Sequence, residues 1–227
     1  MKKKITLQKP EYDITDQMIK ITAYSKKGKS VTAIFDKDDL NTVQAIESWY
    51  AQWDKDFNCY LIQSKTSKIV NGQVKAQKTT LSATILGVSP NAPIHHINGD
   101  LLDNRKSNLE IFDRTKPNDY LELEDGTVAI QLKNRYGYVV AKTLISKNDL
   151  QPLINTEYVW ILQKKANGQP YVSTHAKSDR IYLDQYLTKC PEGFYVHHIN
   201  KNPLDNRREN LEIKELETDK TKSSTSE

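Results

Sequence analysis

The chain has 227 residues, with 33 Lys or Arg and 29 Asp or Glu, so its formal net charge is +4. This length suits one large domain or two domains of about 110 residues. No apolar run approaches the ~18 residues that a membrane span needs, and no apolar stretch follows the positively charged N-terminus, so we expect neither a membrane segment nor a signal peptide. The two cysteines exclude a disulfide framework and indicate a reducing, cytoplasmic setting.

The first half is predicted to combine short strands with one helix. The helix is expected over Lys37–Trp49, with Asp38 or Asp39 as its N-cap, and a short apolar segment follows later at Leu81–Leu86. Strands are predicted over Met18–Tyr24, Ser30–Phe35, the region of Cys59–Ser64, and Gln73–Thr80. The tryptophans are expected to fill the core rather than to stack on a ligand; they are Trp49, Trp53 and Trp160.

Positive charge is concentrated in the first half. Residues 1–118 contain 18 basic and 13 acidic residues, whereas residues 119–227 contain 15 and 16. The 43 residues from Phe57 to Gly99 include no Asp or Glu. An anionic partner such as DNA would favour such a face, although a solvated sheet surface accounts for the same pattern. The candidate DNA-binding residues of this stretch are Lys65, Lys68, Lys75 and Lys78.

The second half is also predicted to be rich in strands. A strand is expected over Gly137–Ile145, a short helix over Asp149–Ile154, and a hairpin over Val159–Thr174 around the turn Asn167-Gly168. Residues 220–227 are expected to be a disordered tail. The candidate DNA-binding residues near the hairpin are Lys164, Lys165, Lys177 and Arg180.

Four of the five histidines lie in two adjacent pairs, His95-His96 and His197-His198. Residues 95–111 read HHINGDLLDNRKSNLEI and residues 197–213 read HHINKNPLDNRRENLEI, with 12 of 17 positions identical at an offset of 102. Weaker similarity links Thr32–Leu40 with Lys142–Leu150 at an offset of 110. An internal duplication of this size predicts an α+β chain of two tandem homologous domains, residues 1–118 and 119–219.

The repeated motif has the chemistry of a metal site. Adjacent histidines at the end of a strand point to opposite sides, so one can face a metal while the other faces a substrate water. Asn108 and Asn210 can bond the backbone of the preceding loop. Imidazole and hard oxygen ligands suit Mg²⁺ or Mn²⁺ and phosphoryl transfer. Arg105 and Arg207 can either grip phosphate or pin the motif by bonding carbonyl groups.

These motifs resemble the HNH nucleases with a ββα-metal active site, and the phage and intron-type homing endonucleases in particular. The resemblance implies a strand-rich DNA-binding segment before each motif, with the motifs at residues 95–118 and 197–219. Family members often carry Leu-His-Arg just upstream, where this chain has Leu81-Ser82-Ala83 and Leu183-Asp184-Gln185. The resemblance assigns His95, Asn118, His197 and Asp219 to the metal, His96 and His198 to general-base catalysis, and Asn104, Asn108, Asn206 and Asn210 to the structure of the motif.

The resemblance implies a DNA endonuclease that depends on Mg²⁺ or Mn²⁺. With two motifs in one chain, we expect a pseudo-symmetric monomer that cuts both strands of double-stranded DNA at a specific site. Homing and restriction roles both fit, in a cytoplasmic protein of phage or mobile-element type. The alternative is a non-catalytic or single-site, nicking DNA-binding protein that uses a degenerate HNH scaffold.

Overall fold

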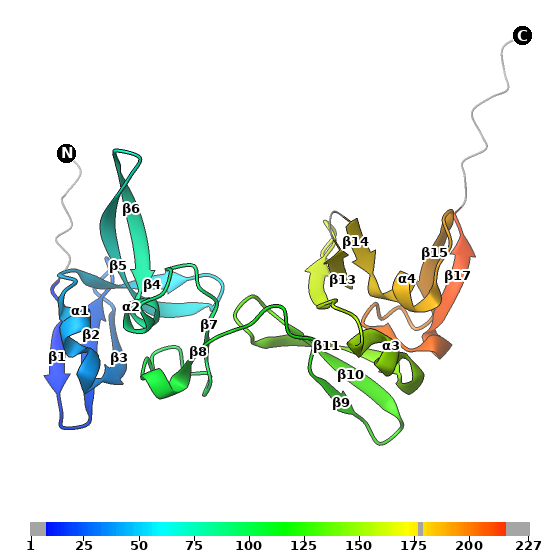
Figure 1. Cartoon of the computed structure of the whole chain (residues 1–227), viewed down its shortest axis with the longest axis horizontal. Helices are drawn as coiled ribbons and strands as arrows, with labels where there is room; N and C mark the ends of the chain where they lie inside the picture. Colours follow the sequence, from blue (N-terminus) through cyan, green and yellow to red (C-terminus); the bar gives the residue numbers. More distant parts are fainter. Residues whose placement is uncertain (1–7, 177–178, 217–227) are drawn as a thin grey trace, which may run out of the picture. The chain divides into compact units, whose positions relative to one another are not determined.

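The computed structural model describes residues 8–176 and 179–216. They form two compact units that divide between Phe112 and Asp113 (Figure 1). We call them unit 1 and unit 2. The boundary precedes the expected one, which followed residue 118. Within the described ranges, no helix is long and apolar enough to cross a membrane. Lys177, Asp219 and residues 220–227 lie outside the described residues, so the predictions for them stay predictions.

Unit 1 contains three small antiparallel sheets and a few short helices. Its strands are β1 (Glu11–Ile14), β2 (Met18–Tyr24), β3 (Ser30–Asp36), β4 (Trp49–Asp54), β5 (Cys59–Val70), β6 (Gln73–Thr80), β7 (Ile94–His96) and β8 (Leu109–Ile111). They pair in the orders β1-β2-β3, β4-β5-β6 and β7-β8. The helices are η1 (Lys37–Asp39), α1 (Leu40–Gln44), α2 (Leu81–Leu86) and η2 (Lys106–Asn108).

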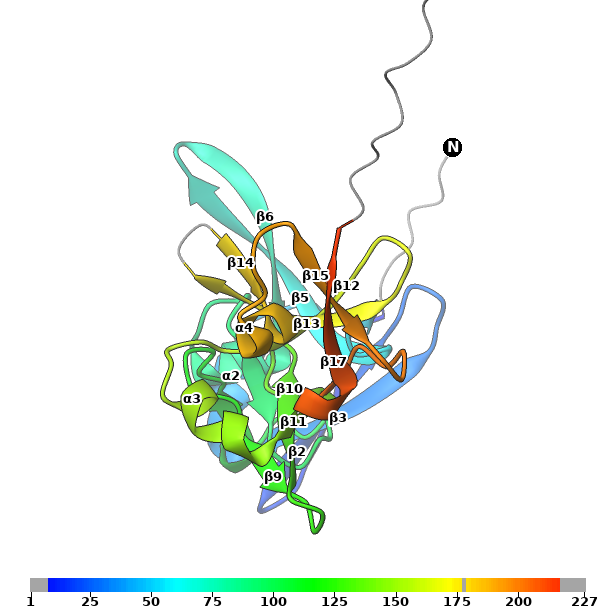
Figure 2. The same cartoon turned by 90° about the vertical axis from the view of Figure 1, so that its right-hand side faces the viewer.

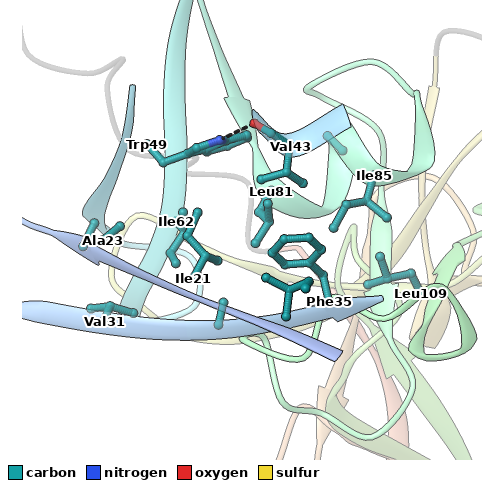
Figure 3. Packing of buried hydrophobic residues seen from close by; sticks show 14 of the residues in the cluster. Ile21, Ala23, Val31, Phe35, Val43, Trp49, Ile62, Leu81, Ile85 and Leu109 are labelled. Carbon is teal, nitrogen blue, oxygen red and sulfur yellow. Dashed lines mark hydrogen bonds between the residues drawn. The ribbon is translucent and has the colours of Figure 1, made fainter. Parts of the chain in front are cut away.

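The core of unit 1 forms because its strands alternate in polarity. Every second residue of β2 and β3 is buried, which places an apolar row from each strand on one face of the sheet. Phe35 from β3 packs there with Leu81 and Ile85 of α2 and with Leu109 of β8, as Figure 3 shows. The apolar face thereby joins the sheet to the strand that follows the first histidine pair.

The expected helix over Lys37–Trp49 is much shorter in the structure. Only η1 and α1 are helical, and Trp49 begins β4 instead. Trp49 is 1% exposed, and its indole Nε1 donates a hydrogen bond of 2.9 Å to the carbonyl of Val43 near the end of α1 (Figure 3). Burial of this large ring in a strand that pairs with β5 outweighs the local preference for helix.

Unit 2 repeats the same kinds of element. Its strands are β9 (Tyr120–Glu122), β10 (Thr127–Lys133), β11 (Val139–Ser146), β12 (Ile161–Lys164), β13 (Pro170–Ala176), β14 (Asp179–Tyr182), β15 (Phe194–His198), β16 (Asp205–Asn206) and β17 (Leu211–Glu215). They pair in the orders β16-β11-β10-β9, β12-β13-β14 and β15-β17. The helices are η3 (Lys147–Asp149), α3 (Leu150–Ile154), α4 (Leu183–Thr188) and η4 (Arg208–Asn210), and Figure 2 shows α4 beside β15 and β17.

The chain is therefore strand-rich with few helices, as the α+β prediction stated. The hairpin around Asn167-Gly168 is confirmed as β12 and β13, and the short helix around Leu150 as η3 followed by α3. The order of elements from β2 to β8 matches the order from β10 to β17. Each run has a pair of strands, a short helix, a three-stranded sheet, a second short helix, and then the strand that carries the histidine pair. Each unit also has its own apolar core.

Candidate functional site

Each histidine pair ends a strand of a two-stranded antiparallel sheet. In unit 1, His95 lies opposite Glu110 and His96 opposite Leu109. In unit 2, β15 and β17 pair in the equivalent register, with His197 opposite Glu212 and His198 opposite Leu211. The loop that joins the two strands contains the remaining residues of the motif, so the geometry of this loop positions the histidines.

Asn108 and Asn210 hold the two ends of this loop together. In unit 1, the amide Nδ2 of Asn108 donates to the carbonyl of Asp103 at 2.8 Å, and its Oδ1 accepts from the backbone N–H of Asn98 at 2.9 Å. In unit 2, Asn210 bonds Asp205 and Asn200 in the same way, at 2.7 and 2.8 Å. Both asparagines thus make the contacts with the loop backbone that their predicted structural role requires.

The two arginines of the motif pin the loop through carboxylates rather than through carbonyl groups. Arg207 donates from Nε and Nη2 to the two carboxylate oxygens of Asp205, at 2.8 and 2.7 Å. Arg105 forms the same fork on Asp103, at 2.9 and 2.6 Å. These hydrogen bonds lower the pKa of both buried aspartates below the usual range. The proposed phosphate contact of the arginines would add to this structural role.

The loop is also fastened to the sheet that precedes it. In unit 1, the backbone of Ile34 in β3 donates to Leu102 and accepts from Asn104, both at 2.8 Å. In unit 2, Leu144 donates to Leu204 at 2.8 Å, and β16 pairs in parallel with β11. Because these strands belong to the core of each unit, the loop has little freedom to move away from it.

The two histidine pairs differ in how far they are open to a ligand. His197 and His198 are half-buried and line a cavity of about 650 Å³ in unit 2. In unit 1, His96 is only 5% exposed, and this burial is the main cause that lowers its pKa, although a hydrogen bond with Asn104 partly opposes the shift. A cavity of about 650 Å³ in unit 1 is lined by Trp53, Tyr60 and the loop residues Gly99–Leu102 instead of by histidines.

Asp184 is a further residue of the unit 2 cavity. It is the second residue of α4, at the position where the resembling family carries the His of Leu-His-Arg, and it lines the cavity with His197 and His198. Burial raises the pKa of its carboxyl, and a hydrogen bond from the backbone N–H of Gln185 partly opposes that shift. The sequence marked this position only as a departure from the family pattern. Its proximity to the histidines follows from the contact of α4 with β15.

Lysines and tyrosines complete the wall of this cavity. Lys165, which follows the β12 strand, and Lys201, which follows the histidine pair, both line it. Tyr171, Tyr182 and Tyr195 do so as well. Ammonium groups beside imidazoles and a carboxylate suit a phosphate-bearing ligand, and aromatic rings suit the sugar or base attached to it.

The imidazole of His198 contacts a buried asparagine. Its Nε2 lies 3.2 Å from Oδ1 of Asn206. The Nδ2 of Asn206 in turn donates to the hydroxyl Oγ1 of Thr143 at 2.9 Å, and that hydroxyl donates to the carbonyl of Leu204 at 2.9 Å. The predicted structural residue Asn206 is therefore a direct neighbour of the predicted base, and Thr143 was not among the predicted residues.

Asn118 and His95 fall in different units. Asn118 belongs to unit 2, where its Nδ2 donates to the carbonyls of Gln131 and Trp160 at 2.9 and 2.8 Å and its Oδ1 accepts from the N–H of Trp160 at 2.8 Å. These bonds tie β10 to the segment before β12. Asn118 thereby has a structural role that the spacing of the motif did not indicate.

The first motif has the short helical turn η2 between its two strands, and no helix directly follows β8. Between β8 and β9, all residues are described and none is helical. Asp113 instead accepts hydrogen bonds from the backbone and the hydroxyl of Thr115, at 2.9 and 2.6 Å, in a side-chain-stabilised turn. Pro117 follows and lacks the N–H that a helix interior needs. After β17 the described residues end at 216.

Two ribbons carry several of the predicted DNA-binding residues. In unit 1, β5 and β6 place Lys65 opposite Lys78, both exposed, and Lys68 opposite Lys75 in the register. In unit 2, Arg180 donates to the hydroxyl of Tyr171 at 3.0 Å, and Lys164 is exposed at the end of β12. Arg180 is thus oriented by a tyrosine of the cavity wall.

Comparison with known proteins bears on unit 2. Residues 180–214 match a family model described as HNH endonuclease. The match begins in β14, includes α4 and the histidine pair, and ends in β17, so it covers the cavity residues Asp184, His197, His198 and Asn206. No curated protein and no solved structure matches the chain. The matched segment supports a nuclease of the HNH type and, with it, DNA as the substrate.

The unit 2 cavity contains side-chain groups that can bind a divalent cation. Within the described ranges, no three side chains of His, Cys, Asp or Glu are grouped to hold a metal ion. The cavity does offer the imidazole of His197 and the carboxylate of Asp184. Mg²⁺ commonly binds one or two protein groups and completes its shell with water and substrate phosphate. The donor set therefore fits a cation that DNA and water help to hold.

Proposed function

We propose that the protein is a metal-dependent DNA endonuclease whose catalytic centre is the cavity of unit 2. The observation that carries this proposal is that His197, His198 and Asp184 converge on one cavity of about 650 Å³ inside the segment that matches the HNH family. A cavity of this size is typical of a site for a small ligand or for one unit of a polymer. Its lysines give it the charge to receive a phosphodiester.

The proposed reaction is hydrolysis of a phosphodiester by water. His198 accepts a proton from the water as the water attacks phosphorus in line with the leaving oxygen. A neutral imidazole suits this role because its ordinary pKa of ~6.5 lies close to physiological pH. Lys165 and Lys201 bind the non-bridging phosphate oxygens and orient the bond that is cleaved.

His197 and Asp184 would hold the divalent cation, Mg²⁺ or Mn²⁺. When bound, the cation supplies positive charge that stabilises the developing charge on the phosphate. Asp219, which lies outside the described residues, remains the proposed further ligand from the C-terminal side of the motif. The fork of Arg207 on Asp205 and the bonds of Asn210 hold the loop that carries the histidines.

Unit 1 is proposed to bind DNA without cutting it. His96, the predicted base, is buried. Asn118, which was expected to bind the metal together with His95, is instead bonded to the backbone in unit 2. The lysines of β5 and β6 would contact the DNA backbone. We infer that the two units are homologous copies and that the second retained the chemistry. The enzyme would then nick one strand of double-stranded DNA. This corresponds to the single-site, nicking alternative that the sequence suggested.

Cleavage of both strands is the second candidate function. It is favoured by the first motif, which keeps its histidine pair, the same strand register as the second motif, and the same loop bonds through Asn108 and Arg105. In this version the protein is a pseudo-symmetric monomer that cuts at a specific site, in a homing or restriction role. The two candidates predict different products from the same substrate.

Supercoiled plasmid separates these candidates. The purified full-length protein, the variants His198→Ala and His96→Ala, and the double variant are incubated with plasmid in Mg²⁺, in Mn²⁺ and in EDTA. We expect nicked circles from the wild type and from His96→Ala, and intact plasmid from His198→Ala and from every sample in EDTA. Loss of a general base commonly lowers the rate by about 10²–10⁴-fold.

Other products would change the conclusion. Linear plasmid from the wild type, with nicked circles from each single variant, would establish two catalytic centres. Unchanged nicking by His198→Ala would contradict the proposed centre. If no condition gives cleavage although the protein binds DNA in a salt-sensitive manner, the chain is a DNA-binding protein on an HNH scaffold.

A further inference from the structure

A chain of buried hydrogen bonds determines which nitrogen of His198 carries a proton. This series of hydrogen bonds starts at the carbonyl of Leu204, which can only accept hydrogen bonds. The hydroxyl of Thr143 lies 2.9 Å from that oxygen and must donate its single proton to it. The oxygen of this hydroxyl is then left with lone pairs only, so its next neighbour has to be a donor.

The next neighbour is the side-chain amide of Asn206. Its Nδ2 lies 2.9 Å from the hydroxyl of Thr143 and 3.3 Å from the carbonyl of Pro203, and both of these oxygens need a donor. The opposite orientation of the amide would place its oxygen against two acceptors. Thr143 and Asn206 are 0% and 1% exposed, so the bond between them is shielded from water. The orientation of Asn206 is therefore fixed, with Oδ1 directed at His198.

The oxygen of Asn206 fixes the tautomer of the histidine. Because Oδ1 accepts hydrogen bonds only, the Nε2 of His198 at 3.2 Å must carry the proton. In a neutral imidazole the other nitrogen, Nδ1, then holds the lone pair. We infer that Thr143 is a positioning residue: through Asn206 it holds His198 in the tautomer whose Nδ1 accepts the proton of the attacking water. This inference rests on the proposed function of His198 as the base.

Unit 1 reaches the same amide orientation through different contacts. Ala33 occupies the position of Thr143, since the following residues Ile34 and Leu144 make equivalent backbone bonds to Leu102 and Leu204. There the Nδ2 of Asn104 donates directly to the carbonyl of Leu102 at 3.1 Å. In unit 2 the hydroxyl of Thr143 lies between the equivalent groups, which are Nδ2 of Asn206 and the carbonyl of Leu204. Both units thus direct the amide nitrogen away from the histidine, although only unit 2 requires a hydroxyl for this.

The test measures the tautomer of His198 by long-range ¹H–¹⁵N NMR of the imidazoles in the full chain, without added metal. Spectra are recorded near pH 8, above the ordinary imidazole pKa of ~6.5. His175 is exposed and provides the unrestrained tautomer ratio in the same spectrum. We expect His198 to be protonated at Nε2 to a greater extent than His175. Equal ratios in the two residues, or a proton on Nδ1 of His198, would overturn the inference.

Two variants of Thr143 connect the tautomer with cleavage. Thr143→Ser keeps the hydroxyl, so the tautomer and the nicking rate should both stay close to those of the wild type. Thr143→Val has a similar shape but places a methyl group against Nδ2 of Asn206, which frees the amide to turn. We expect its His198 ratio to approach that of His175 and its nicking rate to fall roughly 10–100-fold, the loss typical when the partner that orients a histidine is removed.

The outcomes separate this inference from the proposed function. If the wild type shows the expected tautomer but never cleaves plasmid, the proposed function fails and the role of Thr143 as a base-positioning residue fails with it, while the hydrogen-bond chain stands. If the wild type cleaves and Thr143→Val keeps both its tautomer and its rate, only the inference fails. Should Thr143→Val not fold, the wild-type spectrum alone still decides the tautomer.

Discussion

Asp205 is a buried carboxylate on which the loop of unit 2 depends. It is 2% exposed and accepts both donors of the Arg207 fork as well as a bond of 2.7 Å from Nδ2 of Asn200. A buried carboxylate is tolerated when such donors replace the water that it loses. The same residues that give the loop its shape therefore also make it sensitive to the loss of one partner.

We predict that Arg207→Gln destabilises unit 2 by about 2 kcal/mol at pH 7, because it removes two hydrogen bonds to a charged group. In the wild type the pKa of Asp205 lies below its unfolded value of ~3.9. The unfolded state therefore binds more protons as the pH falls below this value, and stability that is present above pH ~4 is lost. The difference between wild type and variant should shrink as the pH falls below ~4. Urea denaturation followed by circular dichroism measures it.

The control for this prediction is Lys214→Gln. Lys214 and Glu212 form an ion pair of 3.0 Å in which both side chains are well exposed to solvent. Loss of such a pair changes stability by less than ~1 kcal/mol. A comparable loss of stability in both variants, or a difference for Arg207→Gln that stays constant down to pH 2, would argue against the buried fork as the cause.

The sequence identified some of the site residues and missed others for a physical reason. Asn108 and Asn210 bond groups within ten residues of themselves, so the motif itself suggested their contacts. Thr143 lies 63 residues before its partner Asn206, and its place beside the motif depends on the parallel pairing of β16 with β11. A motif describes only local contacts, and this contact is formed by the fold.

At the scale of elements, the junction of α1 and β4 shows how packing overrides local preference. The residues up to Gln44 form a helix, as the pattern predicted, and the chain then turns so that Trp49 can enter the core. The three tryptophans also differ in how far they are exposed to solvent. Trp49 and Trp160 are buried as expected, whereas Trp53, near the end of β4, is 42% exposed.

We predict that Trp49→Phe destabilises unit 1 by about 1–3 kcal/mol. The change removes the hydrogen bond from Nε1 to Val43 and leaves a void in a closely packed core. Trp53→Phe, at a position of the same strand that is 42% exposed, should change stability by a smaller amount, less than ~1 kcal/mol. Urea denaturation of both variants measures this. Equal effects would mean that the indole of Trp49 does not anchor the end of α1.

At the scale of the whole molecule, the chain has two separate cores. Among the residues whose burial is described, fifteen form the core of unit 1 and ten form that of unit 2, with no residue in common. The repeat in the sequence predicted two domains, and the structure moves their boundary to Phe112, directly after β8. The predicted boundary followed residue 118, whereas Asn118 bonds the backbone of Trp160 within unit 2.

We predict that the two units unfold in separate steps. Differential scanning calorimetry should resolve two transitions, because each unit buries its own apolar residues. Trp49→Phe should lower the midpoint of one transition and Arg207→Gln that of the other, by roughly 4–8 °C per kcal/mol for units of about 100 residues. A single transition that both variants shift by equal amounts would show that the units fold cooperatively.

The ribbon of β5 and β6 has a consequence for the effect of salt. Lys65 faces Lys78 across the two strands, so two like charges repel each other within the protein itself. Screening by salt weakens this repulsion and so favours the paired ribbon. The same screening weakens any attraction between these ammonium groups and a phosphate backbone. Ionic strength therefore acts on this ribbon in opposite directions, strengthening its internal pairing while reducing its hold on a polyanion.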